Sequence, residues 1–247
     1  MPKRSREDAP VKGPKFGKKM RTSPAKSTHR VKHGELKGVD VLLTQTAIVA
    51  TTNDSSNSVV LNLVPSGATS YNRVGKKIYN QSVRLKGVAI HQVGATTTTS
   101  NTLYTPLRMV VVWDKQPSSG AVPNWDAIFG YTPQNGTEAS TVLSPPRYDN
   151  MDRFTVLRDI ELEPKSIATP FAGVGGTELD GYFYVPFDEY IKLNGRETVF
   201  SGQTAAMTIA DVSTGALYVY FRALVNAAGT SVWTVDSSSV ARLRYTD

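Results

Sequence analysis

Few side chains in this sequence are of the types that usually carry out catalysis or bind metals. The 247 residues include no cysteine and only three histidines, His29, His33 and His91. Without cysteine, the chain has neither a thiol nucleophile nor a thiolate zinc site. His91 lies in an apolar segment at 88–93. We expect it on one face of a strand with a local hydrogen bond, rather than as a general base.

Carboxylates and glycines add no recognisable active site. Asp159, Glu161 and Glu163 alternate along an expected strand, so their side chains share one face. Such a face can bind a cation or form salt bridges with a neighbouring chain, but a solvated or interfacial strand face is the simpler interpretation. The glycine-rich stretch at 173–176 lacks the Lys-Ser/Thr of a phosphate-binding loop. We therefore expect a protein that is not an enzyme, with no cofactor and no metal site.

Basic residues are the second chemically distinctive group, and they are concentrated near the N-terminus. Residues 1–37 carry a net charge of +9, whereas residues 38–247 carry −2. Flexible cationic segments bind nucleic acid by releasing counterions from its phosphates. We predict that this arm binds nucleic acid through Lys3, Arg4, Arg6, Lys12, Lys15, Lys18, Lys19, Arg21, Lys26, Arg30, Lys32 and Lys37.

Two basic clusters within the arm have the spacing of a bipartite nuclear localisation signal. A spacer separates Lys3 and Arg4 from the cluster of Lys18, Lys19 and Arg21. These five residues are able to serve both nuclear import and nucleic-acid binding, and the sequence does not separate the two roles.

A smaller basic cluster lies in the body of the chain, where no acidic residue interrupts positions 73 to 86. We predict that it contributes to nucleic-acid binding; a solvated strand and loop without such contacts is the alternative. Tyr71 and Tyr79 are of a type that stacks on unpaired bases, although burial in the core is the more ordinary role for at least one of them. The basic residues of the cluster are Arg73, Lys76, Lys77, Arg84 and Lys86.

The elements that position these residues fall into two parts. Residues 1–37 contain few large apolar side chains and several prolines, so we predict a disordered basic arm. Residues 38–247 form one folded domain with the hydrophobic period of β-strands and almost no helical pattern. The longest apolar runs are too short to span a membrane as a helix. Eight strands are expected, at 39–49, 78–93, 107–113, 154–160, 182–191, 206–209, 217–221 and 240–245.

The connections between these runs are uneven in length, and no internal repeat is present. This pattern favours an all-β fold, an eight-stranded antiparallel jelly-roll sandwich, over a propeller, a solenoid or an up-and-down barrel. Large apolar residues in the expected loops are predicted to be exposed on the subunit and buried between subunits. They are Trp125, Ile128, Phe129, Tyr131 and Phe171.

Several short segments, taken in order, resemble the coat proteins of geminiviruses. The sequence departs from the plant-virus proteins in having no cysteine. Their cysteine- and histidine-containing stretch therefore has no counterpart here, and the resemblance is to the wider set of circular single-stranded DNA viruses. The segments are Arg73–Lys77 with the following strand Val83–Gly87, Val111–Pro117, Pro123–Phe129, Asp152–Leu157 and Arg242–Tyr245.

This resemblance implies a jelly-roll capsid subunit in an icosahedral shell, with about sixty copies in the simplest closed symmetry. It implies an arm that faces packaged single-stranded DNA, and a protein found in the virion and in the host nucleus during assembly. A host nuclear import receptor is a further implied partner, and no membrane is involved. The alternatives are the coat protein of a small RNA virus and a cellular β-sandwich protein, either a lectin or a nucleic-acid-binding regulator.

Overall fold

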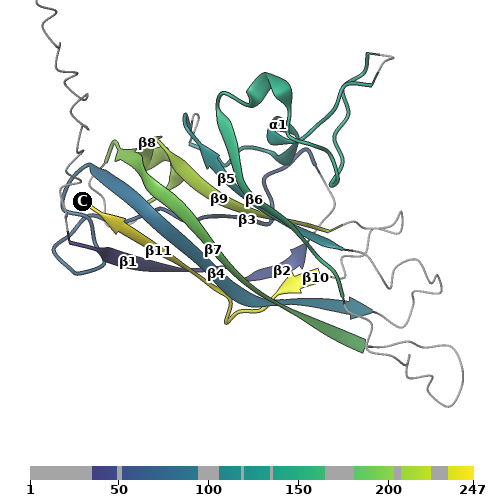
Figure 1. Cartoon of the computed structure of the whole chain (residues 1–247), viewed down its shortest axis with the longest axis horizontal. Coiled ribbons are helices and arrows are strands. Elements are labelled where there is room, and N and C mark those ends of the chain that lie inside the picture. The colour runs from purple at the N-terminus through teal and green to yellow at the C-terminus, as the bar shows by residue number, and fades with distance from the viewer. Residues whose placement is uncertain are drawn as a thin grey trace, which may run out of the picture. The chain divides into compact units, whose positions relative to one another are not determined.

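Two antiparallel sheets contain most of the described residues (Figure 1). The computed structural model describes residues 35–48, 52–93, 106–117, 120–133, 136–164, 181–202, 207–223 and 233–247. All of them belong to one unit of the chain, His33–Asp247. The predicted arm lies outside these ranges except for its last three residues.

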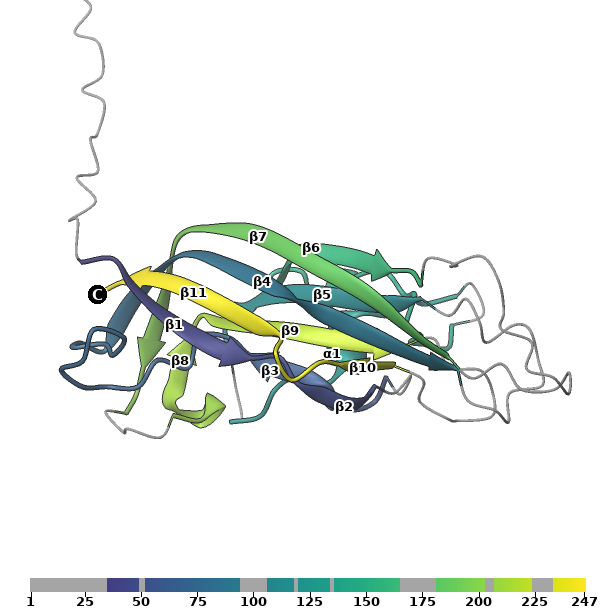
Figure 2. The same ribbon diagram turned by 90° about the horizontal axis from the view of Figure 1, so that it is seen from below.

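The larger sheet contains seven strands, and Figure 2 shows its two long strands, β4 and β7, side by side. Its outermost position is divided between β1 and β2, and the next position between β11 and β10; β4 and β7 follow, and β8 pairs with the end of β7. The bounds are β1 Lys37–Leu42, β2 Gln45–Ile48, β4 Lys77–Val93, β7 Gly181–Phe200, β8 Val212–Thr214, β10 Trp233–Val235 and β11 Val240–Thr246.

The smaller sheet has the strand order β3-β9-β5-β6. Its strands are β3 Ser58–Val60, β9 Ala216–Ala223, β5 Leu107–Asp114 and β6 Phe154–Leu162. The described helices are three short turns, α1 Trp125–Ile128, η2 Tyr148–Asn150 and η3 Ile209–Asp211. No helix among the described residues is long and apolar enough to cross a membrane.

The path of the chain through the two sheets is that of a jelly roll. If β1 with β2 and β10 with β11 are each taken as one interrupted strand, and β8 is set aside, eight strand positions remain. In chain order they form one sheet of order 1-8-3-6 and another of order 2-7-4-5. The chain therefore changes sheet at every connection except the one from β5 to β6, as in double Greek-key sandwiches. The predicted all-β jelly-roll fold is confirmed.

One of the eight predicted strands is wrong. Ala206 lies outside the described residues, and the run that follows it ends in the single turn η3. The backbone N–H and the hydroxyl of Thr208 both donate to the Asp211 carboxylate, which fixes this turn as a capping box. The three strands missed by the sequence, β3, β8 and β10, have only three residues each, too few to show an alternating pattern.

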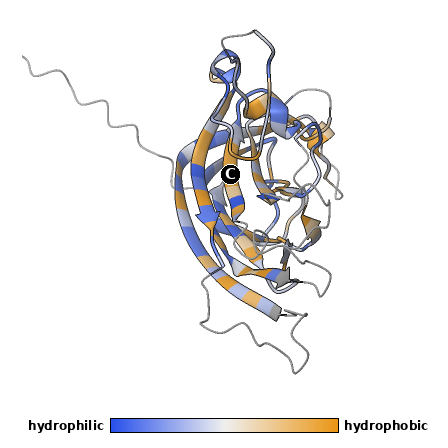
Figure 3. Ribbon diagram, turned by 90° about the vertical axis from the view of Figure 1, so that its right-hand side faces the viewer, coloured by the Kyte–Doolittle hydropathy of each residue, from blue (hydrophilic) through white to orange (hydrophobic). Residues whose placement is uncertain are grey.

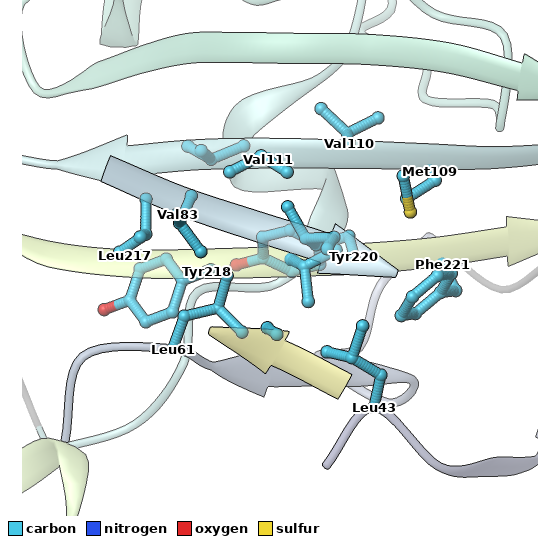
Figure 4. Packing of buried hydrophobic residues seen from close by; sticks show 14 of the residues in the cluster. Leu43, Leu61, Val83, Met109, Val110, Val111, Leu217, Tyr218, Tyr220 and Phe221 are labelled. Carbon is cyan, nitrogen blue, oxygen red and sulfur yellow. The ribbon is translucent and has the colours of Figure 1, made fainter. Parts of the chain in front are cut away.

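The core lies between the sheets, and alternation along the strands positions its side chains. In β11, Ala241, Leu243 and Tyr245 are buried, whereas the two arginines between them are exposed. Figure 3 shows the resulting alternation of polar and apolar residues along the long strands. Figure 4 shows side chains of both sheets packed together, among them Val83 and Leu217.

The second face of the smaller sheet is also covered, so β5 and β9 are buried along their whole length. The segment around α1 packs against this face. The Arg108 guanidinium lies 5.2 Å from the Trp125 ring centroid and 4.7 Å from that of Phe129. Trp125, Ile128 and Phe129 are thus core residues, and the prediction that they are exposed is wrong. Tyr131 is exposed, and Phe171 lies outside the described residues.

Candidate nucleic-acid interface

The predicted nucleic-acid-binding residues of the arm, from Lys3 to Lys32, and with them the predicted localisation signal, lie outside the described residues. Lys37 is described, and it begins β1, one residue before the predicted start of the folded domain. Its buried ammonium group lies 2.9 Å from the Asp247 carboxylate and donates to the backbone oxygen of Asn72. Because this group is already paired and shielded, we leave Lys37 out of the proposed interface.

Arg73 also has a structural role in the folded domain. Its side chain is fully buried, and its guanidinium donates to the carbonyl oxygens of Val64, Gly75 and Gly202. The same group lies 4.2 Å from the centroid of the Phe200 ring. A buried guanidinium whose donors are used by backbone oxygens is not available to phosphates, so Arg73 is removed from the predicted site.

The other four basic residues of the predicted body cluster are exposed. Lys76 precedes β4, and Lys77 forms an ion pair with Glu197 at 2.6 Å. Arg84 and Lys86 lie farther along β4, with their side chains on the outer face of the larger sheet. Tyr71 and Tyr79 are both partly exposed, at 54% and 41%.

The sheet brings Arg84 and Lys86 together with basic residues that are distant in sequence. Arg242 of β11 is the cross-strand partner of Arg84, and Arg244 pairs with Ser82. On the other side of β4, Lys192 of β7 also pairs with Ser82. We name the exposed cations on this outer surface the basic sheet face; its residues are Arg84, Lys86, Lys192, Arg242 and Arg244.

Two acidic residues lie on the basic sheet face, and each accepts hydrogen bonds from one of its arginines. Asp40 of β1 accepts two hydrogen bonds from Arg242, each 2.7 Å long, and Asp188 accepts bonds of 2.7 and 2.6 Å from Arg84. These bonds lower the pKa of both carboxyl groups, so the acids stay ionised at neutral pH. Five cations against two acids leave this surface with an excess of three positive charges.

The remaining three cations, Lys86, Lys192 and Arg244, have no ion pair within the part of the chain that the structure describes. The two paired arginines lie directly opposite each other, an arrangement that costs stability unless anions compensate it. A surface with this charge can hold phosphates electrostatically without reading bases.

Exposed tyrosines form a second feature of the same surface. Tyr182, Tyr184 and Tyr190 of β7 are 57%, 66% and 59% exposed. Tyr190 is the cross-strand partner of Arg84, and Lys192 follows it on the same face. These tyrosines were not among the predicted site residues, although their even-numbered spacing within one predicted strand was the signal that could have identified them.

The structure places the other candidate groups, three carboxylates and one imidazole, on or next to the described strands β6 and β4. Asp159 pairs with Arg108 at 2.6 Å, while Glu161 and Glu163 are exposed on the same strand or just beyond it. No cluster of three or more potential metal ligands occurs among the described residues. His91 is fully buried, and neither ring nitrogen has a hydrogen-bond partner in the described ranges, so the predicted local hydrogen bond is absent there.

Two solved structures are weakly similar to this chain. One is a crystal structure of the T13 IBDV viral particle, with 10% identity and a TM-score of 0.22; the similarity covers 85% of this chain and 35% of that chain. Another is a cryo-EM structure of a semi-empty virus-like particle of the giant freshwater prawn Macrobrachium rosenbergii nodavirus. It has 13% identity and a TM-score of 0.13, and covers 98% of this chain and 95% of that chain. TM-scores this low carry no argument.

Comparison with known families is decisive. No curated protein matches the chain. The sequence does match the profile of the family described as Geminivirus coat protein/nuclear export factor BR1, over residues 2–245. This match confirms the resemblance seen in the short segments and supports a structural role in the virion. The chain therefore belongs to the Geminivirus coat protein/nuclear export factor BR1 family, and its role is that of a viral capsid protein.

Proposed function

We propose that this capsid protein assembles into a closed icosahedral shell and packages single-stranded DNA through its basic arm. The observation that carries the proposal is the charge distribution: the first 37 residues hold +9, and they lead directly into β1 of the folded domain. Because Lys37 is paired with Asp247, each arm is able to neutralise about eight phosphates, one for each remaining unit of net charge. The basic sheet face adds a second cationic surface to the same subunit.

Assembly is the first part of this proposal to test. We expect full-length protein, purified at neutral pH, to form closed shells visible by electron microscopy, because closed symmetric association is typical of coat subunits. Nucleic acid that copurifies should be protected from nuclease in intact shells and digested once the shells are dissociated. A protein that stays monomeric at all salt concentrations and pH values would contradict the proposal.

Electrostatic binding by the arm is the second part. Affinity for single-stranded DNA should fall with rising salt, with log K losing about 0.7 per neutralised phosphate for each unit of log salt. Changing Lys15, Lys18, Lys19 and Arg21 together to glutamine should reduce this slope by up to about 3. The loss should be equal for two unrelated oligonucleotides, since phosphate contacts carry no base information.

The measurement is a titration of wild-type and fourfold variant at several salt concentrations, below the concentration at which subunits assemble. A slope near zero, or a strong preference for one oligonucleotide that the variant loses, would contradict electrostatic packaging. Repeating the titration with RNA of the same sequence distinguishes the proposal from the alternative of an RNA-virus coat protein.

The arm also supports a proposal about localisation. The cluster of Lys3 and Arg4 and the cluster of Lys18, Lys19 and Arg21 are spaced to bind a host import receptor. The family description, which joins coat proteins with a nuclear export factor, is consistent with passage through the nucleus. Single-stranded DNA in the nucleus is then available for packaging by imported subunits.

A further inference from the structure

The outer surface of β7 exposes an unusual amount of aromatic area. Tyr182, Tyr184 and Tyr190 each leave more than half of their surface to solvent. No hydrogen bond or ring contact is formed by these side chains within the described residues. Tyrosine combines an apolar ring with a polar hydroxyl group, and exposed tyrosines are typical of surfaces that bind a partner. The β-strand period places all three side chains on one face.

The register shows how these tyrosines relate to the basic sheet face. Tyr190 pairs with Arg84, so it lies among the cations, whereas Tyr184 pairs with Ile90 and Tyr182 with Gln92 farther along the two strands. Within the described residues, the surface thus passes from a strongly cationic part to an aromatic part without leaving the pair of strands β4 and β7. Figure 2 shows these two long strands side by side.

The combination of charge and aromatic rings selects the type of occupant. The excess positive charge favours a polyanion, and exposed rings favour flat groups that can stack on them. In a duplex the faces of the bases are hidden in the stack, whereas a single strand can turn them toward an aromatic surface. A protein partner without acidic residues at this surface would satisfy the rings but would leave Lys86, Lys192 and Arg244 without compensating anions.

We propose that the outer surface of β4 and β7 binds single-stranded nucleic acid directly, with phosphates on the basic sheet face and unpaired bases stacked on Tyr182, Tyr184 and Tyr190. This site rests on the proposed packaging function and adds a contact to bases that the arm does not supply. It gives the folded domain a preference for unpaired over paired strands, without a preference for sequence.

The test compares full-length protein with an oligothymidylate and with an abasic oligodeoxynucleotide of the same length. The two ligands carry the same number of phosphates, but only the oligothymidylate has bases that can stack on the tyrosines. Binding is measured by fluorescence anisotropy below the assembly concentration. Wild-type protein should prefer the oligothymidylate by about tenfold for each base that stacks. A threonine triple variant at these positions, Y182T/Y184T/Y190T, should lose this preference and keep its affinity for the abasic ligand.

A matched control changes exposed tyrosines outside this surface. Tyr131 and Tyr148 are 46% and 90% exposed on the segment between β5 and β6, and the variant Y131T/Y148T should retain the full preference. Threonine keeps a high strand propensity, and an unchanged thermal melt verifies that each variant is folded. A second variant, K86Q/K192Q/R244Q, should weaken binding of both ligands by the same factor.

The outcomes separate this site from the packaging function on which it rests. If wild-type protein binds both ligands with equal affinity, base stacking is excluded while the electrostatic role of the arm stands. If it binds neither ligand, the packaging function fails as well. If the triple variant keeps the preference, bases stack elsewhere. If it keeps the preference but no longer assembles into shells, the tyrosines contact a second subunit, and the proposed site is overturned.

Discussion

Replacement of Arg153 by methionine is expected to lower the free energy of unfolding by about 3–5 kcal/mol. Arg153 donates two hydrogen bonds of 2.9 Å to the carboxylate of Asp114, which is fully buried at the end of β5. The backbone N–H of Gln116 would remain as a hydrogen-bond donor to this carboxylate, but no cation would be paired with it in the described structure. A buried charge that loses its partner keeps the full cost of its removal from water, which makes the effect large.

The experiment is urea denaturation of unassembled subunits, with Arg84→Met as the matched control. Arg84 also holds an aspartate with two hydrogen bonds, but both groups of that pair are exposed, and exposed pairs contribute little to stability. The double variant with Asp114→Asn should recover part of the loss, since it removes the unpaired charge. Equal losses for Arg153→Met and the control would show that burial of Asp114 does not determine the energy of its pair.

Acidification is expected to destabilise the folded domain through His91. Burial lowers the pKa of this imidazole to about 4 from its ordinary value of 6.5. The ring lies between Trp233 and Phe183, with centroids 4.7 and 6.0 Å away. Between pH 6.5 and pH 4, His91 binds a proton in the unfolded chain but not in the folded one. The contribution is therefore complete above pH 6.5 and is lost as the pH falls toward 4, by about 3 kcal/mol in total.

The variant His91→Phe isolates this contribution from that of the carboxylates that titrate in the same range. It keeps an aromatic ring between Trp233 and Phe183 and removes the two nitrogen atoms, for which the described residues supply no hydrogen-bond partner. The difference in unfolding free energy between variant and wild type should grow in favour of the variant as the pH is lowered from 7 to 4. Parallel pH profiles would show that His91 gains a proton in the folded state as readily as in the unfolded one.

The sequence was a good guide where a strand is long and its pattern regular. Arg84 and Lys86 were expected on one strand, and the structure exposes both from β4, because side chains two apart share a face. The strand predicted at 206–209 failed because a local interaction, the bond between Thr208 and Asp211, determines the turn there. A pattern of hydrophobic residues gives no information about such hydrogen bonds between side chains and the backbone.

The candidate site was predicted only in part, for two physical reasons. Arg73 and Arg84 have the same residue type and lie in the same basic cluster, yet the first is fully buried and donates to the distant Gly202 carbonyl, whereas the second is exposed. Lys192, Arg242 and Arg244 were missed because they approach β4 only through strand pairing with residues more than a hundred positions away. The pairing register between distant strands determines which charges share a surface. This register cannot be read from the order of charged residues along the chain.

The position of β1 has a consequence for how the subunit is made. In the larger sheet β1 pairs with β11, and β11 separates it from β4. The ribosome therefore synthesises nearly 200 residues between β1 and its partner, which takes about 10–40 s at ordinary elongation rates. During that time β1 has no partner strand, since β11 has not yet been made. The strand edge to which β1 binds forms only after β11 has left the ribosome. A truncated translation product that lacks β11 therefore cannot add β1 to the larger sheet.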